Sequence, residues 1–184
     1  SIWFYILVQY IHRSWKTWKH KIKTQTTTTV FINHQLLIMH LHIVSLFPEI
    51  FDSFFATSLL SKAQEKWIIS VDFCNPRTFC KDKHQQIDDE IYGWWAWMLI
   101  KAEPIIDAVE SIITKYKLKE TDFKILFPSP SEEIFTQRNA YAYSKQEHLI
   151  FVCWRYEGID YRRELYMQKH YPQNFEKISL WQFI

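Results

Sequence analysis

Glycine is almost absent from this chain of 184 residues, and its absence limits the turns that the backbone can make. A chain of this length would usually hold roughly 13 glycines, but only Gly93 and Gly158 occur here, beside nine tryptophans. Tight turns and helix ends often need positive φ, which glycine adopts without steric cost. Either the fold avoids such turns, or some tryptophans occupy positions that would suit glycine.

From Met39 onward, segments with strand patterns alternate with segments with helix patterns. This alternation predicts an α/β fold with a mostly parallel sheet and helices on both faces. The expected strands are 40–47, 67–74, 122–129, 148–153 and 177–184, and the expected helices are 48–66, 103–117 and 160–171. Because the chemistry of such sheets lies at the carboxyl ends of strands, we expect site residues in SLFPE, CNPRTF, FPSPSEE and VCWRYEGID.

Two signals of function are missing from residues 39–184, a basic overall charge and a cysteine framework. Residues 1–38 hold five of the 22 basic residues and no acid, so residues 39–184 carry 17 basic against 20 acidic groups. The body therefore has no overall basic charge that would indicate a nucleic-acid-binding protein. Three cysteines without C-x-x-C spacing predict neither a disulfide scaffold nor a zinc site, and they favour a reducing cytoplasm.

Residues 1–38 differ in composition from the rest of the chain. The apolar stretch 1–11 is too short to span a bilayer, and its basic residues come after it rather than before it, unlike a signal peptide. We expect residues 1–38 to be a non-native upstream extension of a domain that starts at Met39. A membrane-surface peptide remains an alternative, because basic and aromatic residues alternate there.

Five motifs lie at the expected strand ends and span most of residues 39–184. They are IVSLFPEIF (43–51), NPRTFCKDKHQQIDDEIYG (75–93), SPSEEIFTQ (129–137), VCWRYEGIDYR (152–162) and ISLWQF (178–183). In sequence and in order they resemble the bacterial tRNA (guanine-N1)-methyltransferase family, whose members methylate the guanosine directly 3′ of the anticodon. The resemblance implies an α/β fold with a SPOUT-type trefoil knot, truncated here at its C-terminal end.

The resemblance also bears on the tryptophans. Each of the six that come after Met39 aligns with a glycine position of the family: 67, 94, 95, 97, 154 and 181. We infer that a gene in which UGA encodes glycine was translated with UGA as tryptophan. Two alternatives stay open: the indoles form a platform that stacks bases, or they fill a core.

The family resemblance implies S-adenosylmethionine as the methyl donor, bound by three loops. In this chain the loops are 127–131, 153–158 and 179–184. Close backbone approach to the donor would explain the family's glycines there, and an indole at Trp154 or Trp181 would fill the adenosine space. The implied cofactor-binding residues are Ser129, Pro130, Trp154, Tyr156, Glu157, Leu180, Trp181, Gln182, Phe183 and Ile184.

The implied catalytic residues are Arg162, Glu157 and the residue at the family's aspartate position, Gln182. Arg162 would stabilise developing charge, unless it is an ordinary solvated helix arginine. Glu157 would face the guanine or the donor, unless it serves only as an acid at a helix N-terminus. The segment that would contact RNA contains Arg77, His84, Asp88, Asp89, Tyr92 and Gly93; without the resemblance it would be a polar loop.

Gln182 departs from the family pattern in a way that affects the mechanism. The aspartate of the family is the general base for the guanine N1 proton, and a neutral amide does not accept that proton. Asp160 or Glu157 would have to accept it. A non-catalytic RNA-binding relative that kept the fold is therefore an alternative function.

Partners and further groups are also implied by the resemblance. We expect tRNA as substrate, a homodimer with the active site at the subunit interface, and no membrane association. The family allows for Mg²⁺, although the sequence contains no metal-binding motif. The family's C-terminal tRNA-binding helical domain has no counterpart before Ile184, so residues 39–184 are expected to be an incomplete S-adenosylmethionine-binding domain.

Overall fold

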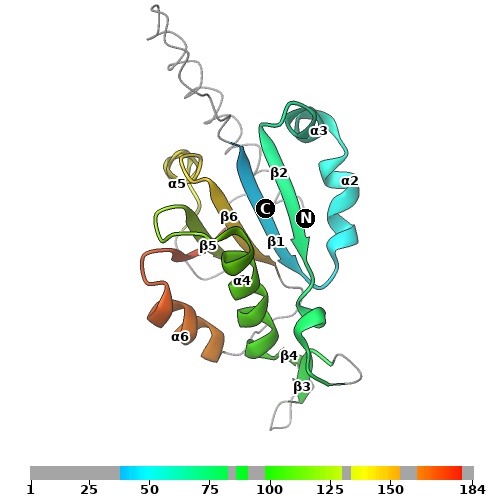
Figure 1. Cartoon of the computed structure of the whole chain (residues 1–184), viewed down its shortest axis with the longest axis vertical. Helices are drawn as coiled ribbons and strands as arrows, with labels where there is room; N and C mark the ends of the chain where they lie inside the picture. Colours follow the sequence, from blue (N-terminus) through cyan, green and yellow to red (C-terminus); the bar gives the residue numbers. More distant parts are fainter. Residues whose placement is uncertain (1–37, 83–85, 91–97, 130–133, 154–160, 180–184) are drawn as a thin grey trace, which may run out of the picture.

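The computed structural model describes residues 38–82, 86–90, 98–129, 134–153 and 161–179. Its centre is a parallel sheet of five strands in the order β2-β1-β6-β5-β7 (Figure 1). The pairs β1–β2, β1–β6, β5–β6 and β5–β7 are all parallel. The strands are β1 (Met39–Ser45), β2 (Ile69–Cys74), β5 (Phe123–Pro128), β6 (His148–Cys153) and β7 (Phe175–Ile178).

Helices cover both faces of this sheet, as the alternation of elements predicted. Alternate residues of β1 separate the two layers: Leu41 and Ile43 pack with α2, α3 and α5, whereas Val44 packs with α4 and α6. Figure 1 shows α4 and α6 in front of the sheet. The bounds are α2 (Asp52–Phe55), α3 (Ser58–Glu65), α4 (Ala102–Tyr116), α5 (Gln137–Tyr143) and α6 (Tyr161–His170). The predicted fold class is confirmed.

The helix predicted over residues 48–66 is divided into three parts. A 3₁₀ turn, η1 (Pro48–Phe51), leads into α2, and α3 begins only after Thr57. Thr57 has an extended backbone, with φ −109° and ψ 149°, and its hydroxyl donates to the carbonyl of Phe54 over 3.1 Å. A threonine that bonds its own neighbouring backbone competes with helix continuation, which explains the break.

The second strand begins two residues later than predicted because Trp67 lies in the turn that ends α3. Trp67 N–H donates to Gln64 and Ile68 N–H to Ala63, both over 2.9 Å, and Trp67 has φ 53°. This pair of bonds is a Schellman motif, whose left-handed residue is usually glycine. The indole is 69% exposed, so packing does not explain why tryptophan occupies the position.

The same motif ends α4, with Lys117 as the left-handed residue. Lys117 has φ 52°, and its N–H and that of Leu118 donate to Thr114 and Ile113. Trp67 and Lys117 are the two residues other than glycine with positive φ in the described ranges. The turn geometry that the glycine deficit made problematic is therefore used twice, each time by a residue with a Cβ atom.

Three further elements differ from the prediction. The last strand, predicted over 177–184, is found at Phe175–Ile178, where Phe175 packs edge-to-face on Phe127 at 4.8 Å. Helix α5 was not foreseen. A small antiparallel hairpin, β3 (Asp88–Glu90) with β4 (Met98–Ile100), was also not foreseen, and it comes after the 3₁₀ turn η2 (Pro76–Phe79).

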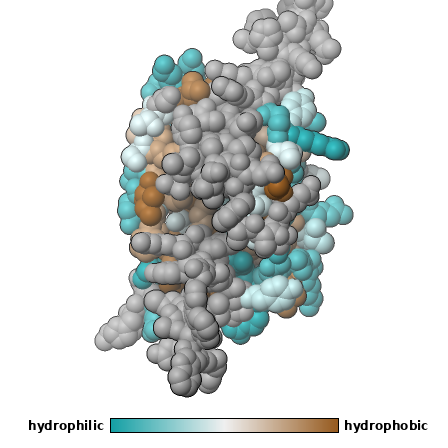
Figure 2. Space-filling model, turned by 180° about the vertical axis from the view of Figure 1, so that it is seen from behind, coloured by the Kyte–Doolittle hydropathy of each residue, from teal (hydrophilic) through white to brown (hydrophobic). Residues whose placement is uncertain are grey.

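The described part of the outer surface is mixed in hydropathy, as expected for a sheet that helices cover on both faces. Figure 2 views the molecule from behind and shows, for the described residues, hydrophilic side chains along the rim and scattered apolar ones between them. In the described ranges, no helix combines the length and apolarity that crossing a membrane requires.

Candidate active site at the carboxyl ends of the strands

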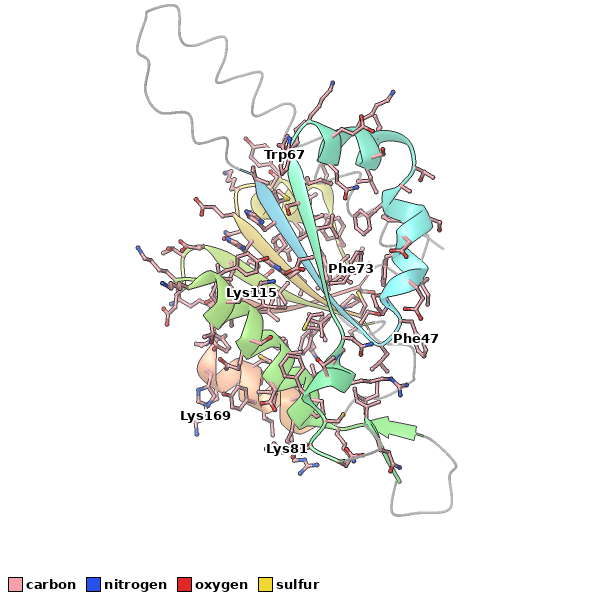
Figure 3. All side chains as sticks on the ribbon, turned by 45° about the vertical axis from the view of Figure 1, so that its right-hand side comes forward. Phe47, Trp67, Phe73, Lys81, Lys115 and Lys169 are labelled. Atoms are coloured by element: carbon pink, nitrogen blue, oxygen red, sulfur yellow. The ribbon has the colours of Figure 1, made fainter. Side chains whose placement is uncertain are left out.

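All five strands of the main sheet point the same way, so their carboxyl ends form one edge. Ser45, Cys74, Pro128, Cys153 and Ile178 end the five strands. Figure 3 shows Phe47, just beyond β1, at this edge, and Trp67 at the opposite, amino edge. Four of the five sequence motifs begin or end along the carboxyl edge, which is where ligands bind in open parallel sheets.

The half of this edge formed by β6, β5 and β7 contains the expected cofactor loops. Ser129, directly after β5, donates its N–H to the carbonyl of Ile178 over 2.8 Å. Phe135 donates its N–H to Ser179 over 2.7 Å, and Ile134 bridges Ser179 in parallel. The segment after β5 is thus fastened on both sides of 130–133 to the end of β7.

The three segments that the family resemblance assigns to the methyl donor therefore follow three adjacent strands, β6, β5 and β7. Of the expected cofactor-binding residues, Ser129 is described and lies at this edge. The others fall outside the described residues: Pro130, Trp154, Tyr156, Glu157, Leu180, Trp181, Gln182, Phe183 and Ile184. The arrangement of strand ends fits a ligand held by these three segments together.

Arg162 lies in the first turn of α6, exposed, where the chain leaves the carboxyl edge to return toward β7. The neighbouring residues anchor this turn. The guanidinium of Arg163, 5% exposed, stacks 4.1 Å above the ring of Phe127 near the end of β5. Glu164 pairs with Lys177 of β7 over 2.9 Å. The turn that carries Arg162 is thereby held next to the ends of β5 and β7.

The other half of the edge, at β2, carries the residues expected to contact RNA. Asn75 caps η2: its side chain accepts the N–H of Arg77 over 3.0 Å and lies 3.5 Å from the carbonyl of Leu46, beyond β1. Arg77, which is half-buried, therefore sits in a turn that is tied to the ends of both β1 and β2.

The β3–β4 hairpin extends from this half of the edge. Asp88 and Asp89 lie in β3, paired with Ile100 and Leu99. Lys101 donates its N–H to Ile87 over 2.8 Å, and its ammonium donates to the carbonyl of Gln86 over 3.0 Å, which attaches the hairpin to the start of α4. The remaining expected RNA-contacting residues, His84, Tyr92 and Gly93, lie outside the described residues.

The structure thus separates the predicted residues into two groups on one edge. Ser129 and Arg162 lie by β5 and β7, and Arg77 lies by β2, with β1 and β6 between them. A small donor molecule would fit beside the first group, and an extended polymer could reach both. The roles that the resemblance assigned to these residues remain predictions.

The acid–base character of this edge is limited in the described part. Cys153 ends β6, and burial raises the pKa of its thiol to about 12. The thiol is therefore neutral at pH 7 and is unsuited to accept a proton. Among the described residues, no group of three or more His, Cys, Asp or Glu side chains could hold a metal ion.

Two residues that organise the edge were not singled out from the sequence. Asn75 stands before Pro76, and an Asn followed by Pro is a signal for the start of a turn, which would have identified it as a cap. Arg163 gave no such signal, because charged residues are rarely buried. Its burial depends on the ring of Phe127, which is 36 residues earlier in the chain.

Comparison with known proteins places these features in a family. The sequence model described as "tRNA (Guanine-1)-methyltransferase TrmD" matches residues 39–184. A tRNA (guanine-N(1)-)-methyltransferase of Dictyoglomus turgidum is 42% identical over 125 residues, which are 68% of this chain and 49% of the relative. That of Carboxydothermus hydrogenoformans is 46% identical over 124 residues, 67% of this chain and 47% of the relative.

The same name is carried by a relative from Oceanobacillus iheyensis, 40% identical over 124 residues, which are 67% of this chain and 49% of the relative. The chain spans about half the length of the curated relatives that it matches.

Proposed function

The chain belongs to the tRNA (guanine-1)-methyltransferase family, and we propose that it forms the methyl-donor domain of an enzyme that methylates N1 of a guanine in tRNA. The observation that carries the proposal is the junction of β5, β6 and β7. Three donor-binding segments leave adjacent strands there, and Ser129 and Phe135 fasten two of them together.

The methyl donor is S-adenosylmethionine, which supplies an electrophilic methyl group on a sulfonium. The segments 127–131, 153–158 and 179–184 would hold it, and on transfer its S–CH₃ bond would break to leave the neutral thioether S-adenosylhomocysteine. Positioning of this kind can supply much of the rate acceleration of a group transfer. The donor fits this edge because the described strand ends bring all three segments to one place.

Arg162 stabilises the negative charge that develops on the guanine as its N1 proton is removed. Its helix turn is held against β5 and β7 by Arg163 and Glu164. A fixed cation near developing negative charge contributes more in a site shielded from water than in bulk solvent. The helix anchor therefore serves the chemistry by limiting how far Arg162 can move.

The N1 proton must leave the guanine as the methyl group arrives. Gln182 stands at the position of the family's aspartate and has no basic group. We assign proton acceptance to Glu157 or Asp160, the two carboxylates of the YEGID segment. If neither acts, the chain would be the non-catalytic RNA-binding relative that kept the fold.

The proposal extends to partners and location. The tRNA substrate would lie along the carboxyl edge, from the donor at β5 and β7 to Arg77 and the hairpin at β2. A SPOUT-type trefoil knot, a homodimer with the active site at its interface, and a cytoplasmic location belong to the same proposal. So does Mg²⁺, for which the described residues offer no cluster of ligands.

The test is a methylation assay with the protein expressed at the length of its relatives and with glycine at positions 67, 94, 95, 97, 154 and 181. An unmodified tRNA transcript is incubated with S-adenosylmethionine and digested to oligonucleotides with a ribonuclease. Mass spectrometry should detect 1-methylguanosine from the position 3′ of the anticodon. Binding of tRNA without this product would replace the proposal with the non-catalytic alternative, and an absence of tRNA binding would refute both.

A further inference from the structure

Three histidines form a cluster at the amino edge of the sheet, far from the candidate active site along the strands. His40 and His42 alternate on β1 and therefore face the same side, and His148 lies directly opposite His40 on β6. The rings of His40 and His148 stack with centroids 4.7 Å apart and planes at 10°. The side chains of His42 and His148 are 1% and 8% exposed.

His42 and His148 share one hydrogen bond, between Nε2 of His42 and Nδ1 of His148, which lie 2.9 Å apart. Two neutral imidazoles can form such a bond, because one nitrogen donates and the other accepts. If both rings were protonated, two N–H groups would face each other at this distance. The observed geometry therefore requires that the pair carry at most one added proton.

The last turn of α4 covers this pair. The ring of Tyr116 lies 4.7 Å from that of His42 and 5.5 Å from that of His148. On β2, Asp72 accepts hydrogen bonds from Lys115 over 3.0 Å and from Tyr116 over 2.9 Å. Asp72 is 3.9 Å from Nδ1 of His42, and this buried nitrogen has no hydrogen-bond partner among the described residues.

The charged groups around the cluster do not favour a cation on His42. Lys115 on α4 and His40 on β1 oppose protonation there, and Asp72 supports it from β2. Burial alone would raise the pKa of Asp72, but its bonds from Lys115 and Tyr116 outweigh burial and hold that pKa below its ordinary value. The negative charge of Asp72 is thus already stabilised by Lys115 and Tyr116.

The surroundings of His148 and His40 lead to the same result. Asp122, before β5, favours the protonated form of His148, and Glu147 favours that of His40. Burial prevails at both residues: the pKa of His148 falls to about 4, with His40 adding to the effect, and the pKa of His40 is lowered. Burial, and next the neighbouring His148, also lowers the pKa of His42 to about 4.

We propose that the His42–His148 pair is an acid-sensitive clasp, whose protonation releases the last turn of α4 from the amino ends of β1 and β6 while the carboxyl edge stays folded. The opening is confined to the amino edge because the released helix turn carries Tyr116, which covers the two rings, and Lys115, which bonds Asp72. The carboxyl edge is fastened by backbone bonds, such as those of Ser129 and Phe135, which do not titrate.

The direction of the pH effect comes from proton linkage. A histidine in an unfolded chain has a pKa near ~6.5, above the value of about 4 for both members of the pair in the folded chain. Between these values the unfolded or opened state binds more protons than the folded state. The clasp therefore contributes fully above about pH 6.5 and is lost as the pH falls toward about 4.

Hydrogen exchange on the full chain tests whether the opening is local. The reporter is the N–H of Leu118, which bonds Ile113 in the turn that ends α4, and the control is the N–H of Phe135, bonded to Ser179. From about pH 7 to about pH 5 the protection factor of Leu118 should fall at least about tenfold more than that of Phe135. Equal falls would overturn the proposal.

Substitution tests the cause. The double variant His42→Leu/His148→Leu keeps side chains of similar volume at both buried positions and removes both titrating groups. Thermal unfolding of the parent chain should occur at least about 5 °C lower at about pH 5 than at about pH 7, and the double variant should lose at least half of that difference. His170→Leu, an exposed histidine on α6, should retain it. An unchanged difference in the double variant would refute the clasp.

A third measurement covers the case in which the double variant does not fold. In the unmodified chain, the imidazole C–H resonances of His42 and His148 should titrate together with midpoints below about pH 5. Midpoints near the ordinary histidine value of about 6.5 would contradict the proposal whatever the variants do.

Discussion

The two edges of the parallel sheet are held in different ways. At the carboxyl edge, backbone groups fasten the described loops to one another, as Ser129 and Phe135 do to the end of β7. At the amino edge, buried side chains add to backbone bonds such as that from His40 to Glu147: the histidine cluster joins β1 and β6, and Asn174 joins the starts of β5 and β7. Because backbone groups make these bonds, the side chains of the loops at the carboxyl edge are available to bind a ligand.

The contrast has a measurable consequence. Substitutions at the amino edge should cost stability, whereas substitutions of side chains at the carboxyl edge should cost activity with little effect on stability. Single substitutions at each edge, with an exposed neighbour as control, test this division.

The largest effect is expected from Arg162→Ala in the active, glycine-restored enzyme. Removal of a charge-stabilising donor should lower the methylation rate by about 100-fold. Because Arg162 is exposed in the first turn of α6, the melting temperature should stay the same. Lys169→Ala, on the exposed side of the same helix, is the matched control and should keep the rate within about twofold. A similar small loss for Arg162→Ala would remove this residue from the site.

A smaller effect, on stability alone, is expected at the amino edge from Asn174→Ala. Asn174 is 2% exposed, and its amide donates to the carbonyls of Glu120 over 2.6 Å and Phe123 over 2.7 Å. Leaving buried acceptors without donors should lower the free energy of unfolding by about 2 kcal/mol. Urea denaturation measures this change. The exposed neighbour offers the control Gln173→Ala, which should change it by less than about 0.5 kcal/mol.

Donor binding should be unaffected by Asn174→Ala at temperatures where the variant is folded. If the variant lost affinity for S-adenosylmethionine while remaining folded, the two edges would be coupled and the division between them would be wrong.

The next effect is a gain in stability at the two helix ends with positive φ. Trp67→Gly should raise the free energy of unfolding by about 1 kcal/mol, because glycine relieves the clash between Cβ and the backbone in this conformation. Trp67→Ala keeps Cβ and should give no such gain. Lys117→Gly, in the same motif at the end of α4, should give a gain of similar size.

This pair of helix ends also separates two explanations of the tryptophan. A gain at both positions would show that φ alone decides. No gain for Trp67→Gly, with a gain for Lys117→Gly, would show that the indole makes a stabilising contact and that residue 67 suits tryptophan.

The smallest effect is expected from deletion of residues 1–38. Because the composition changes at Met39, the melting temperature of residues 39–184 should match that of the whole chain within about 1 °C. A fall of several degrees would show that the extension packs on the domain.

Much of the fold could be predicted because strand and helix patterns in this chain are local. β6 was predicted with its observed bounds, His148–Cys153, and α4 within one residue. The position of β7 depended instead on contacts with a distant strand: Lys124 of β5 pairs with Glu176 over 2.6 Å. No local pattern encodes such a contact, so the predicted strand began two residues late.

Helix α5 was missed for a different reason. Its start at Thr136 is a capping box in which Asn139 stands where Glu or Gln is more usual, and the helix is only seven residues long. A short helix without an apolar stripe gives little periodic signal. The break at Thr57 likewise came from one side chain bonding to its own backbone.

The candidate site could be predicted as far as the motifs extended. The structure places Ser129, Arg162 and Arg77 along the carboxyl edge, as the motifs indicated. The anchoring of Arg162 through Arg163 and Phe127 could not be predicted, because it depends on two elements meeting in space. The histidine cluster could have been suspected from the alternation of His40 and His42 on a strand, which places them on one face.

The central claim, that the ends of β5, β6 and β7 hold the methyl donor, is tested most directly by calorimetric titration of S-adenosylmethionine. Two versions of the enzyme are compared, one with Trp and one with Gly at positions 154 and 181, which come after β6 and β7 in the sequence. Trp67→Gly, at the amino edge, is the control and should leave affinity unchanged. An indole in the donor space should cost ~1–3 kcal/mol of binding free energy through overpacking. Each ~1.4 kcal/mol weakens the affinity for the donor tenfold. The account predicts that the glycine version binds at least about tenfold more tightly; equal affinities would place the donor elsewhere and contradict it.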